Sequence, residues 1–371
     1  MKFNKTLYIT AAVIILALIA VFMGTRDKSD IRIAALFPLS GGLASYGEPA
    51  QRVVQIAINE INESGGIDGR PLEIDFQDHK CDPKTATSIF QQMSNVNKIN
   101  LFLAVGCSGT VLSIAPQLND QILLGSAITS PKISGVSPYV FRNYASDEVE
   151  SELFAQEIKK RGYKTIGVIY EETDYAKGLR INLEKYLEGS NVIVISEGFI
   201  SGSTDVRTQV TKIKSEKPDA VFVSPQTVAS GDLVLGEMQK QAYKPKLIVN
   251  ENILKSQDLI SKYSNLLENT LSADYVLENN AKLDALLVKY KEVYGVECPQ
   301  KNICATMYDN VYFLANALKE RGMDIKDTQE YLKTESYSGV SGIIAFDEKN
   351  DRKNSSYTLF EIRNGKGVEV K

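Results

Sequence analysis

Hydroxyl side chains stand directly after two of the apolar segments that the sequence predicts to be strands. Ser108 follows the strand-like run 101–105 and precedes a predicted helix over 110–118. The next strand-like run, 122–124, leads into the Ser/Thr-rich stretch 126–130. Adjacent strand ends in a parallel sheet lie about 5 Å apart, and hydroxyls together with free helix N–H groups can hold a carboxylate. The pattern therefore indicates either a site for a small anionic ligand or ordinary turn chemistry.

An enzymatic function is the least supported interpretation of these residues. Ser108 lies in the segment GCSGT, which lacks the G-x-S-x-G spacing of a nucleophile elbow. The chain has a single histidine, His79, and its surroundings are typical of a loop. The Gly-Gly pairs near the N-terminus match neither a dinucleotide-binding fingerprint nor a P-loop. We therefore expect no enzyme activity and no cofactor.

Positioning these loops requires a sheet, and strand-like and helix-like segments alternate along the chain. Apolar residues recur at helical spacing within 50–61, which predicts a helix that packs on the sheet between the first two strands. Such alternation is typical of parallel strands joined by right-handed crossovers. Strands are predicted at 31–37, 72–76, 101–105 and 122–124, and again at 165–170, 192–196, 220–224 and 247–250.

The same alternation starts a second time after residue 142, with 137–147 as the connecting segment. Two serial α/β units of similar size predict two lobes with a cleft between them. The chain has 371 residues, of which 43% are hydrophobic, enough for one large or two medium cores. Further helices are predicted at 148–161, 176–187, 204–215, 283–294 and 306–321, and short strands at 343–347, 357–362 and 368–370.

The N-terminal region contains an uninterrupted apolar segment, Leu7 to Gly24, preceded by two lysines. At 1.5 Å per residue the segment spans roughly 27 Å, close to the hydrocarbon core of about 30 Å. The lysines place its beginning in the cytoplasm by the positive-inside rule. Small residues suited to signal cleavage are poorly placed at its end. We expect residues 1–30 to form an uncleaved membrane anchor, with a cleaved signal as the alternative. Either way, Ile31 onward lies outside the cytoplasm.

The four cysteines suit an oxidising compartment. Cys81 and Cys107 each stand at the end of a predicted strand, whereas Cys298 and Cys304 bracket the short segment PQKNI. We expect two disulfides, of which the longer loop contributes about 3 kcal/mol. The alternative is a zinc site. No CxxC pair is present, however, and His79 lies near only one of the cysteines, so no metal is expected.

Charge excludes nucleic acid as the expected partner. The formal net charge is −4, and residues of both signs are mixed along the chain without a basic stripe.

The segment from Leu36 to Pro83 resembles the opening of type I periplasmic solute-binding proteins of the branched-chain amino acid (leucine/isoleucine/valine-binding) family. The further matching segments are QDHKCDP, GCSGT, SAITSP, VIYEETDYAKG, MYDNVYFLANAL and SGVSGIIAFDEKNDR. The order of these segments over residues 31–370 carries the resemblance. In that family the cysteines equivalent to Cys81 and Cys107 are bridged.

The resemblance implies which residues bind the ligand. In the family, a serine and a threonine that correspond to Ser108 and Thr129 hold the ligand carboxylate, with backbone groups at Ala127. An aromatic residue in the first loop corresponds to Tyr46, and one on the second lobe corresponds to Tyr175. These five positions come from both predicted lobes, so the ligand is expected to lie in the cleft.

Family members that bind α-amino acids place an acidic side chain after the strand that here ends in IVNEN, so the resemblance implies Glu251 as the partner of the ligand ammonium. A buried carboxylate discriminates against uncharged analogues because they leave it unpaired. The alternatives are a solvated Glu251 on the surface, and Asp309 as the ammonium partner. Where family members that recognise leucine have an aromatic residue, this chain has Gln226 or Thr227, and a further contact falls near Ile303. A polar residue there weighs against strictly aliphatic specificity.

The expected fold class is α/β, with two Rossmann-like lobes of the Venus-flytrap type joined by hinge crossovers and an N-terminal transmembrane helix. Lobe I is expected over 31–142 plus about 276–338, and lobe II over 143–275 plus about 339–371. The expected function is capture of an amino acid, of the branched-chain type, by cleft closure for an ABC importer at the extracytoplasmic membrane face, or in the periplasm after cleavage. Its partners are the transporter permease and the membrane. The alternative is a sensing module for urea, a short amide or an amino acid.

Overall fold

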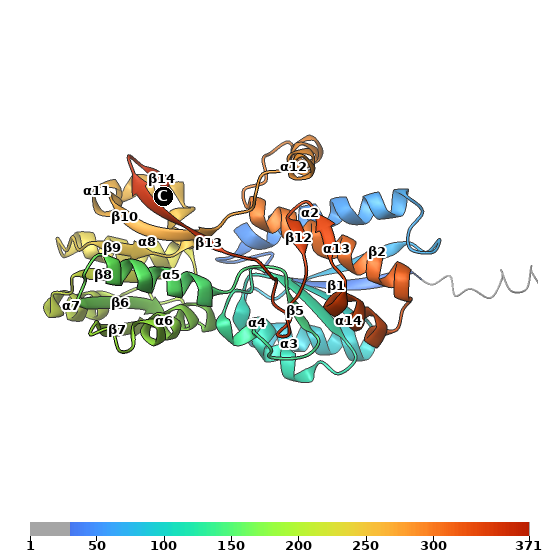
Figure 1. The fold of residues 1–371 in the computed structure, drawn as a ribbon, viewed down its shortest axis with the longest axis horizontal. Coiled ribbons are helices and arrows are strands. Elements are labelled where there is room, and N and C mark those ends of the chain that lie inside the picture. The colour runs from blue at the N-terminus through green and yellow to red at the C-terminus, as the bar shows by residue number, and fades with distance from the viewer. Residues whose placement is uncertain (1–29, 371) are drawn as a thin grey trace, which may run out of the picture.

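Two mainly parallel β-sheets, one in each of two lobes, form the frame of the protein (Figure 1). The structure is a computed structural model that describes residues 30–370. Helices cover both faces of each sheet, which is the arrangement that alternating strands and helices produce. The predicted two-lobed α/β architecture is therefore confirmed.

The sheet of the first lobe has the strand order β2-β1-β3-β4-β5, and every neighbouring pair is parallel. Its central strand β3 is buried at all positions, as expected for a parallel sheet covered on both faces. The strands are β1 (Ile31–Phe37), β2 (Leu72–Asp78), β3 (Leu101–Val105), β4 (Ile122–Ser126) and β5 (Val140–Arg142).

The predicted apolar stripe of residues 50–61 lies on α2 (Ala44–Glu63) and is buried against the sheet and α13. This packing confirms the amphipathic helix that the spacing indicated. The other elements of this lobe are α3 (Pro83–Gln91), α4 (Ser108–Ile114), α12 (Ala281–Tyr294), α13 (Lys301–Arg321), α14 (Ile325–Thr334), β11 (Tyr337–Gly339) and β12 (Gly342–Ile344), with a π-helical turn at Gln92–Val96 and 3₁₀ turns at Ala115–Gln117 and Pro131–Ile133.

The sheet of the second lobe has the order β14-β13-β10-β9-β8-β6-β7. The strands from β6 to β10 pair in parallel, whereas β13 and β14 join as antiparallel strands at one edge. The strands are β6 (Thr165–Glu171), β7 (Ile193–Phe199), β8 (Ala220–Ser224), β9 (Leu247–Val249), β10 (Thr270–Tyr275), β13 (Tyr357–Arg363) and β14 (Lys366–Glu369). The helices are α5 (Asp147–Lys160), α6 (Asp174–Leu187), α7 (Arg207–Glu216), α8 (Val228–Lys240), α9 (Glu251–Leu254), α10 (Gln257–Lys262) and α11 (Ser264–Leu267).

Three segments, 143–146, 276–280 and 345–356, connect the lobes. The first and third are tied together, because Arg352 Nη1 donates a hydrogen bond of 2.9 Å to Asn143 Oδ1. Crossings that touch one another form a narrow joint about which two rigid lobes can rotate, which is the geometry of hinge closure.

The predicted boundary of the third crossing is residue 339, and residues that pack on the first lobe follow it. Val340, Ile344 and Phe346 are buried in the core of the first lobe. We therefore propose that the boundary falls after Phe346. The short β11–β12 hairpin then belongs to lobe I.

Both predicted disulfides are present, and they join Cys81 to Cys107 and Cys298 to Cys304. The first bridges the loops after β2 and β3 at one edge of the sheet. The second does not close a free loop as expected, because Cys304 lies inside the first turns of α13. Helix α13 begins at Lys301, five residues before the predicted start.

The predicted membrane anchor, residues 1–30, falls almost entirely outside the described part of the chain. Within residues 30–370, no helix is long and apolar enough to cross a bilayer.

Candidate functional site

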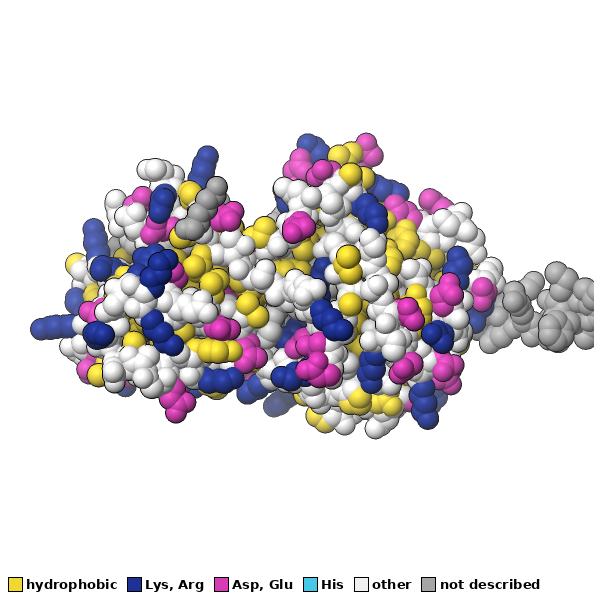
Figure 2. All heavy atoms as spheres, in the orientation of Figure 1, with side chains coloured by type: hydrophobic (Ala, Val, Ile, Leu, Met, Phe, Trp, Pro, Cys, Tyr) yellow, Lys and Arg dark blue, Asp and Glu magenta, His cyan; other side chains and the backbone are white. Residues whose placement is uncertain are grey.

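A cavity between the two lobes lies at the carboxyl ends of strands from both sheets, the usual position of ligand sites in α/β proteins. Its interior volume is about 20 Å³, roughly the room that one water molecule needs. Figure 2 shows the surface hollowed between the lobes, with charges of both signs scattered over the face in view. All seven predicted ligand-binding residues line this cavity: Tyr46, Ser108, Ala127, Thr129, Tyr175, Gln226 and Glu251.

The first lobe contributes hydroxyl and backbone groups. Ser108 is the first residue of α4, directly after β3, and its side chain is buried. Its oxygen accepts a hydrogen bond of 3.1 Å from the backbone N–H of Ser130. The Ser108 hydroxyl proton therefore remains available to a ligand. Ala127 adopts a left-handed backbone conformation, φ 52°, between β4 and Thr129. This turn brings Ala127 and Thr129 to the same cavity wall.

A buried arginine holds that wall in place. The Arg142 side chain is fully buried and forms an ion pair of 2.7 Å with Asp351 on the third crossing. Its Nη1 donates hydrogen bonds of 3.0 Å to the carbonyls of Thr129 and Ser130. One side chain thus links the ligand-facing loop after β4 to the hinge. Sequence reasoning missed this role of Arg142.

The second lobe contributes a buried carboxylate. Glu251 is the first residue of α9, after β9, and its Oε2 accepts a hydrogen bond of 2.8 Å from the hydroxyl of Tyr175. Asn250 Nδ2 donates to the same Tyr175 oxygen over 3.1 Å. Burial raises the pKa of Glu251, and the nearby Lys255 ammonium opposes that rise. The alternative of a solvated surface Glu251 is therefore wrong.

Two further carboxyl groups lie close to Glu251 in the first turn of α5. Asp147 and Glu150 are buried, and burial, followed by the charge of Glu251, raises the pKa of each well above its usual range. Within residues 30–370, neither carboxylate oxygen of Glu150 has a hydrogen-bond partner. The protein therefore favours the neutral form of both groups, and the whole cluster favours a cation over an anion beside Glu251.

Direct contacts join the lobes across the cavity mouth. The Tyr46 hydroxyl donates a hydrogen bond of 2.7 Å to Oδ1 of Asn252 on the other lobe. Lys132 forms an ion pair of 3.0 Å with Asp174, and the Ser130 hydroxyl donates to the Asp174 carbonyl over 3.1 Å. The structure therefore represents a closed arrangement of the lobes.

Of the two candidates after β8, Gln226 lines the cavity and Thr227 does not. The Thr227 hydroxyl instead accepts from the Ser230 N–H at 3.1 Å and caps α8. The backbone N–H of Gln226 donates to Glu171 Oε2 over 2.7 Å, and Ser201 donates to the other Glu171 oxygen over 2.6 Å. The Gln226 backbone is thus held by a buried carboxylate.

Two other predicted positions lie elsewhere. Asp309 is fully buried on α13, where its carboxylate accepts from the N–H groups of Val340 and Ser341 at 2.8 and 2.7 Å. It therefore holds the β11–β12 turn and is not available to an ammonium group. Ile303 is buried in the core of the first lobe because it lies within α13. The predicted contact near Ile303 is wrong.

Sequence reasoning missed five residues of the cavity wall. Leu43 precedes α2, and Gly106 and Cys107 follow β3. Asn252 follows Glu251. Its place after the end of a strand is the sequence signal that could have identified it. Tyr144 lies on the first crossing, where no periodic pattern marks a ligand-facing side chain. The missed residues are Leu43, Gly106, Cys107, Tyr144 and Asn252.

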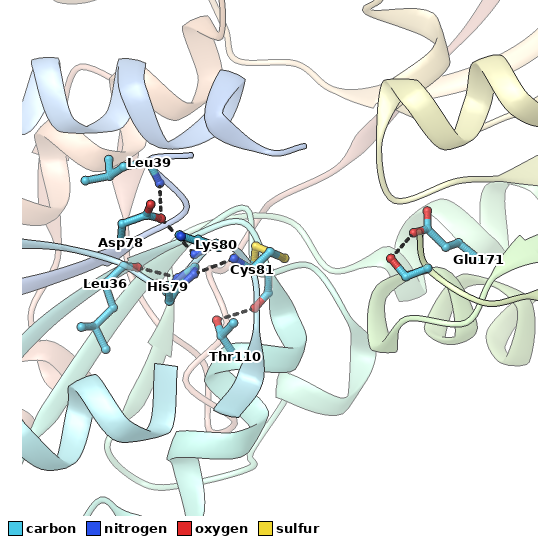
Figure 3. The surroundings of a disulfide bond; sticks show 10 residues. Leu36, Leu39, Asp78, His79, Lys80, Cys81, Thr110 and Glu171 are labelled. Atoms are coloured by element: carbon cyan, nitrogen blue, oxygen red, sulfur yellow. Dashed lines mark hydrogen bonds between the residues drawn. A yellow bond between two sulfur atoms is a disulfide. The ribbon is translucent and has the colours of Figure 1, made fainter. Parts of the chain in front are cut away.

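The only histidine of the chain, His79, is buried beside the first disulfide (Figure 3). The Cys81 N–H donates to His79 Nδ1 over 3.0 Å, so Nε2 carries the proton and donates to the Leu36 carbonyl over 3.1 Å. Burial lowers the pKa of His79 to about 4. His79 is therefore neutral at pH 7 and braces the loop that carries Cys81.

This histidine predicts a loss of stability in mild acid. Its folded pKa lies below the unfolded value of about 6.5, so the unfolded state binds more protons between these values and stability falls as pH decreases through that window. Between pH 7 and pH 5 we expect the free energy of unfolding of the wild type to fall by about 2 kcal/mol more than that of His79→Gln. Urea unfolding of both proteins at the two pH values measures this difference. Parallel losses in the two proteins would contradict a buried neutral His79.

The chemistry available in the cavity is recognition. It offers hydroxyl donors on one wall, one carboxylate on the other, and amide side chains, with no imidazole among its lining residues. Across residues 30–370, no group of three or more His, Cys, Asp or Glu side chains is placed to hold a metal ion.

Two α/β lobes that close over a polar cavity define a two-lobed solute-binding protein. The sequence profile described as periplasmic binding protein matches residues 30–367, so the chain belongs to that family. It is a solute-binding protein and not an enzyme.

Curated relatives align over almost the whole chain. A leucine-, isoleucine-, valine-, threonine- and alanine-binding protein of Pseudomonas aeruginosa is 24% identical and covers 89% of both chains. The Leu/Ile/Val-binding protein of Escherichia coli is 24% identical over 94% of this chain and 96% of its own.

Solved structures show the same fold. A leucine-binding protein from Thermotoga maritima has a TM-score of 0.80 and 23% identity, covering 92% of this chain and 98% of its own. A solute-binding protein from R. palustris in complex with benzoate has a TM-score of 0.77 and 15% identity, covering 92% of this chain and 95% of its own.

Proposed function

We propose that this protein captures a free α-amino acid between its lobes and delivers it to an ABC importer. The observation that carries the proposal is the pairing of the two cavity walls. Hydroxyl and backbone donors face the cavity from one lobe, and the buried carboxylate of Glu251 faces it from the other. An α-amino acid carries the complementary carboxylate and ammonium groups on one carbon atom.

Each wall would read one charged group of the ligand. The Ser108 hydroxyl, the Thr129 side chain and backbone groups at Ala127 would hold the carboxylate. Glu251 would hold the ammonium, with the Tyr175 hydroxyl keeping its carboxylate oriented. Closure of the second lobe over the first excludes water, so these charge-assisted hydrogen bonds strengthen in the lower local dielectric.

The named ligands of the relatives support this proposal. The curated relatives above are amino acid-binding proteins by name, and a solved neighbour of the same fold binds benzoate. Amino acids and benzoate share a carboxylate, but only amino acids bring an ammonium group. A buried acidic partner such as Glu251 therefore favours the amino acid class.

The proposed partner is the permease of an ABC importer, because solved neighbours of this fold are described as ABC transporter binding proteins. The closed form, in which contacts such as Tyr46 with Asn252 join the lobes, is the form that a permease would recognise. We propose an extracytoplasmic location, in agreement with both disulfides and with the family name.

Calorimetric titration of the full chain against the twenty amino acids, urea, short amides and benzoate tests the function. We expect saturable binding of one group of amino acids and no binding of benzoate. Binding of urea or an uncharged amide alone would contradict the proposal and favour the sensing module.

A further inference from the structure

We infer that the ligand's side chain is short, polar and uncharged, carrying an amide or a hydroxyl group, and is not a branched hydrocarbon. This inference rests on the proposed function and concerns the side chains of the cavity wall that the proposal assigns to neither charged group of the ligand. Besides the disulfide-bonded Cys107, these are Leu43, Tyr46, Tyr144, Gln226 and Asn252.

These five side chains are poor in aliphatic carbon. Leu43 is the single aliphatic one, whereas two tyrosines and two amides make up the rest. A site for a branched hydrocarbon side chain is expected to be lined chiefly by apolar groups, with few polar atoms left to satisfy. The composition of the wall therefore favours a ligand that can form hydrogen bonds there.

The hydrogen-bond inventory of the two amides leaves groups unused. Within residues 30–370, the side-chain amide of Gln226 makes no hydrogen bond, although its backbone N–H is anchored on Glu171. Asn252 Oδ1 accepts from Tyr46, and its Nδ2 donates one proton to the Pro225 carbonyl over 3.2 Å. One Asn252 N–H and both ends of the Gln226 amide thus remain for a ligand.

These unused groups favour a ligand that can form hydrogen bonds. The Gln226 side chain is partly exposed in this closed structure, so water can also pair with its amide. A leucine, isoleucine or valine side chain offers the Gln226 amide and the Asn252 N–H neither a donor nor an acceptor. A ligand amide or hydroxyl would pair with the Gln226 amide, because an amide offers both a donor and an acceptor.

Charge limits the ligand side chain further. Among residues 30–370, Glu251 is the one charged side chain that lines the cavity, and Asp147 and Glu150 lie close to it. The nearby cation, Lys255, is paired with Asp274 over 2.7 Å. An acidic ligand side chain would therefore meet carboxyl groups and no free cation. Uncharged amide and hydroxyl side chains remain as the favoured class.

Calorimetric titration of the full chain with L-glutamine, L-asparagine, L-threonine and L-serine, and with L-leucine, L-isoleucine and L-valine, tests the inference. We expect at least one polar amino acid to bind at least tenfold more tightly than any of the three hydrocarbon ones. Tighter binding of leucine, isoleucine or valine would overturn the inference and leave the proposed function intact. Binding of none of the twenty amino acids would overturn both.

A matched pair of variants tests the assigned residue. Gln226→Leu is expected to reduce the preference for polar ligands at least tenfold, because it removes the unpaired amide. Gln257→Leu changes an exposed glutamine on α10, outside the cavity, and should leave the preference unchanged. A polar preference that survives in Gln226→Leu would show that Gln226 does not set the specificity.

Discussion

Glu251→Gln is expected to weaken amino acid binding by at least about 2 kcal/mol, roughly a thirtyfold rise in Kd. The glutamine carbonyl can still accept from the Tyr175 hydroxyl, so the local hydrogen bond survives. The ligand ammonium, however, loses its charged partner in a closed, water-poor cavity. The loss should therefore appear in binding and not in folding. Titration calorimetry on both proteins, with unfolding curves alongside, measures the two effects separately.

Glu188→Gln is the matched control for this variant. Glu188 is an exposed carboxylate at the end of α6, outside the cavity, and its replacement should leave Kd unchanged. If Glu251→Gln binds the amino acid as tightly as the wild type does, Glu251 is not the ammonium partner.

Arg142→Met is expected to lower the free energy of unfolding by about 3–5 kcal/mol. The substitution leaves Asp351 without its cation and removes the donor shared by the carbonyls of Thr129 and Ser130. It also frees the loop that carries Thr129, so any remaining folded protein should bind its ligand more weakly. Urea unfolding monitored by circular dichroism measures the change in stability.

The control for this loss is Arg207→Met, because the Arg207 side chain is 74% exposed, whereas that of Arg142 is fully buried. We expect its effect on the unfolding free energy to stay within about 0.5 kcal/mol. A loss below about 1 kcal/mol for Arg142→Met would show that the arginine does not clamp the loop.

Much of the fold could be predicted from local pattern. The strands β1, β3 and β8 have the predicted bounds because each is a mainly apolar run whose residues, apart from the half-buried Arg32, are buried on both faces. Strand β10 was missed. Its sequence TLSADY mixes polar residues into a strand that lies between two others, and Ser272 is satisfied there only by the carbonyl of Val249 on the neighbouring strand. Such a partner cannot be seen in a single segment.

The site was predictable only in part, for the same reason. Residues directly after strands, such as Ser108 and Glu251, could be placed because the carboxyl ends of parallel strands meet at one edge. Tyr144 and Arg142 could not, since their roles depend on how the crossings pack. Arg142 acts on Asp351, 209 positions away. The resemblance placed seven residues in the cavity, and the packing of α13 excluded Ile303.

We expect both charged groups of one amino acid to be bound at once, one by each lobe. The most direct test is a titration of the full chain with the tightest-binding amino acid, its N-acetyl derivative and its α-carboxamide. N-acetylation removes the ammonium charge, and the carboxamide removes the carboxylate charge. We predict at least a thirtyfold loss of affinity for each derivative, about 2 kcal/mol. If either derivative binds as tightly as the parent amino acid, the lobe assigned to the missing charge does not read it.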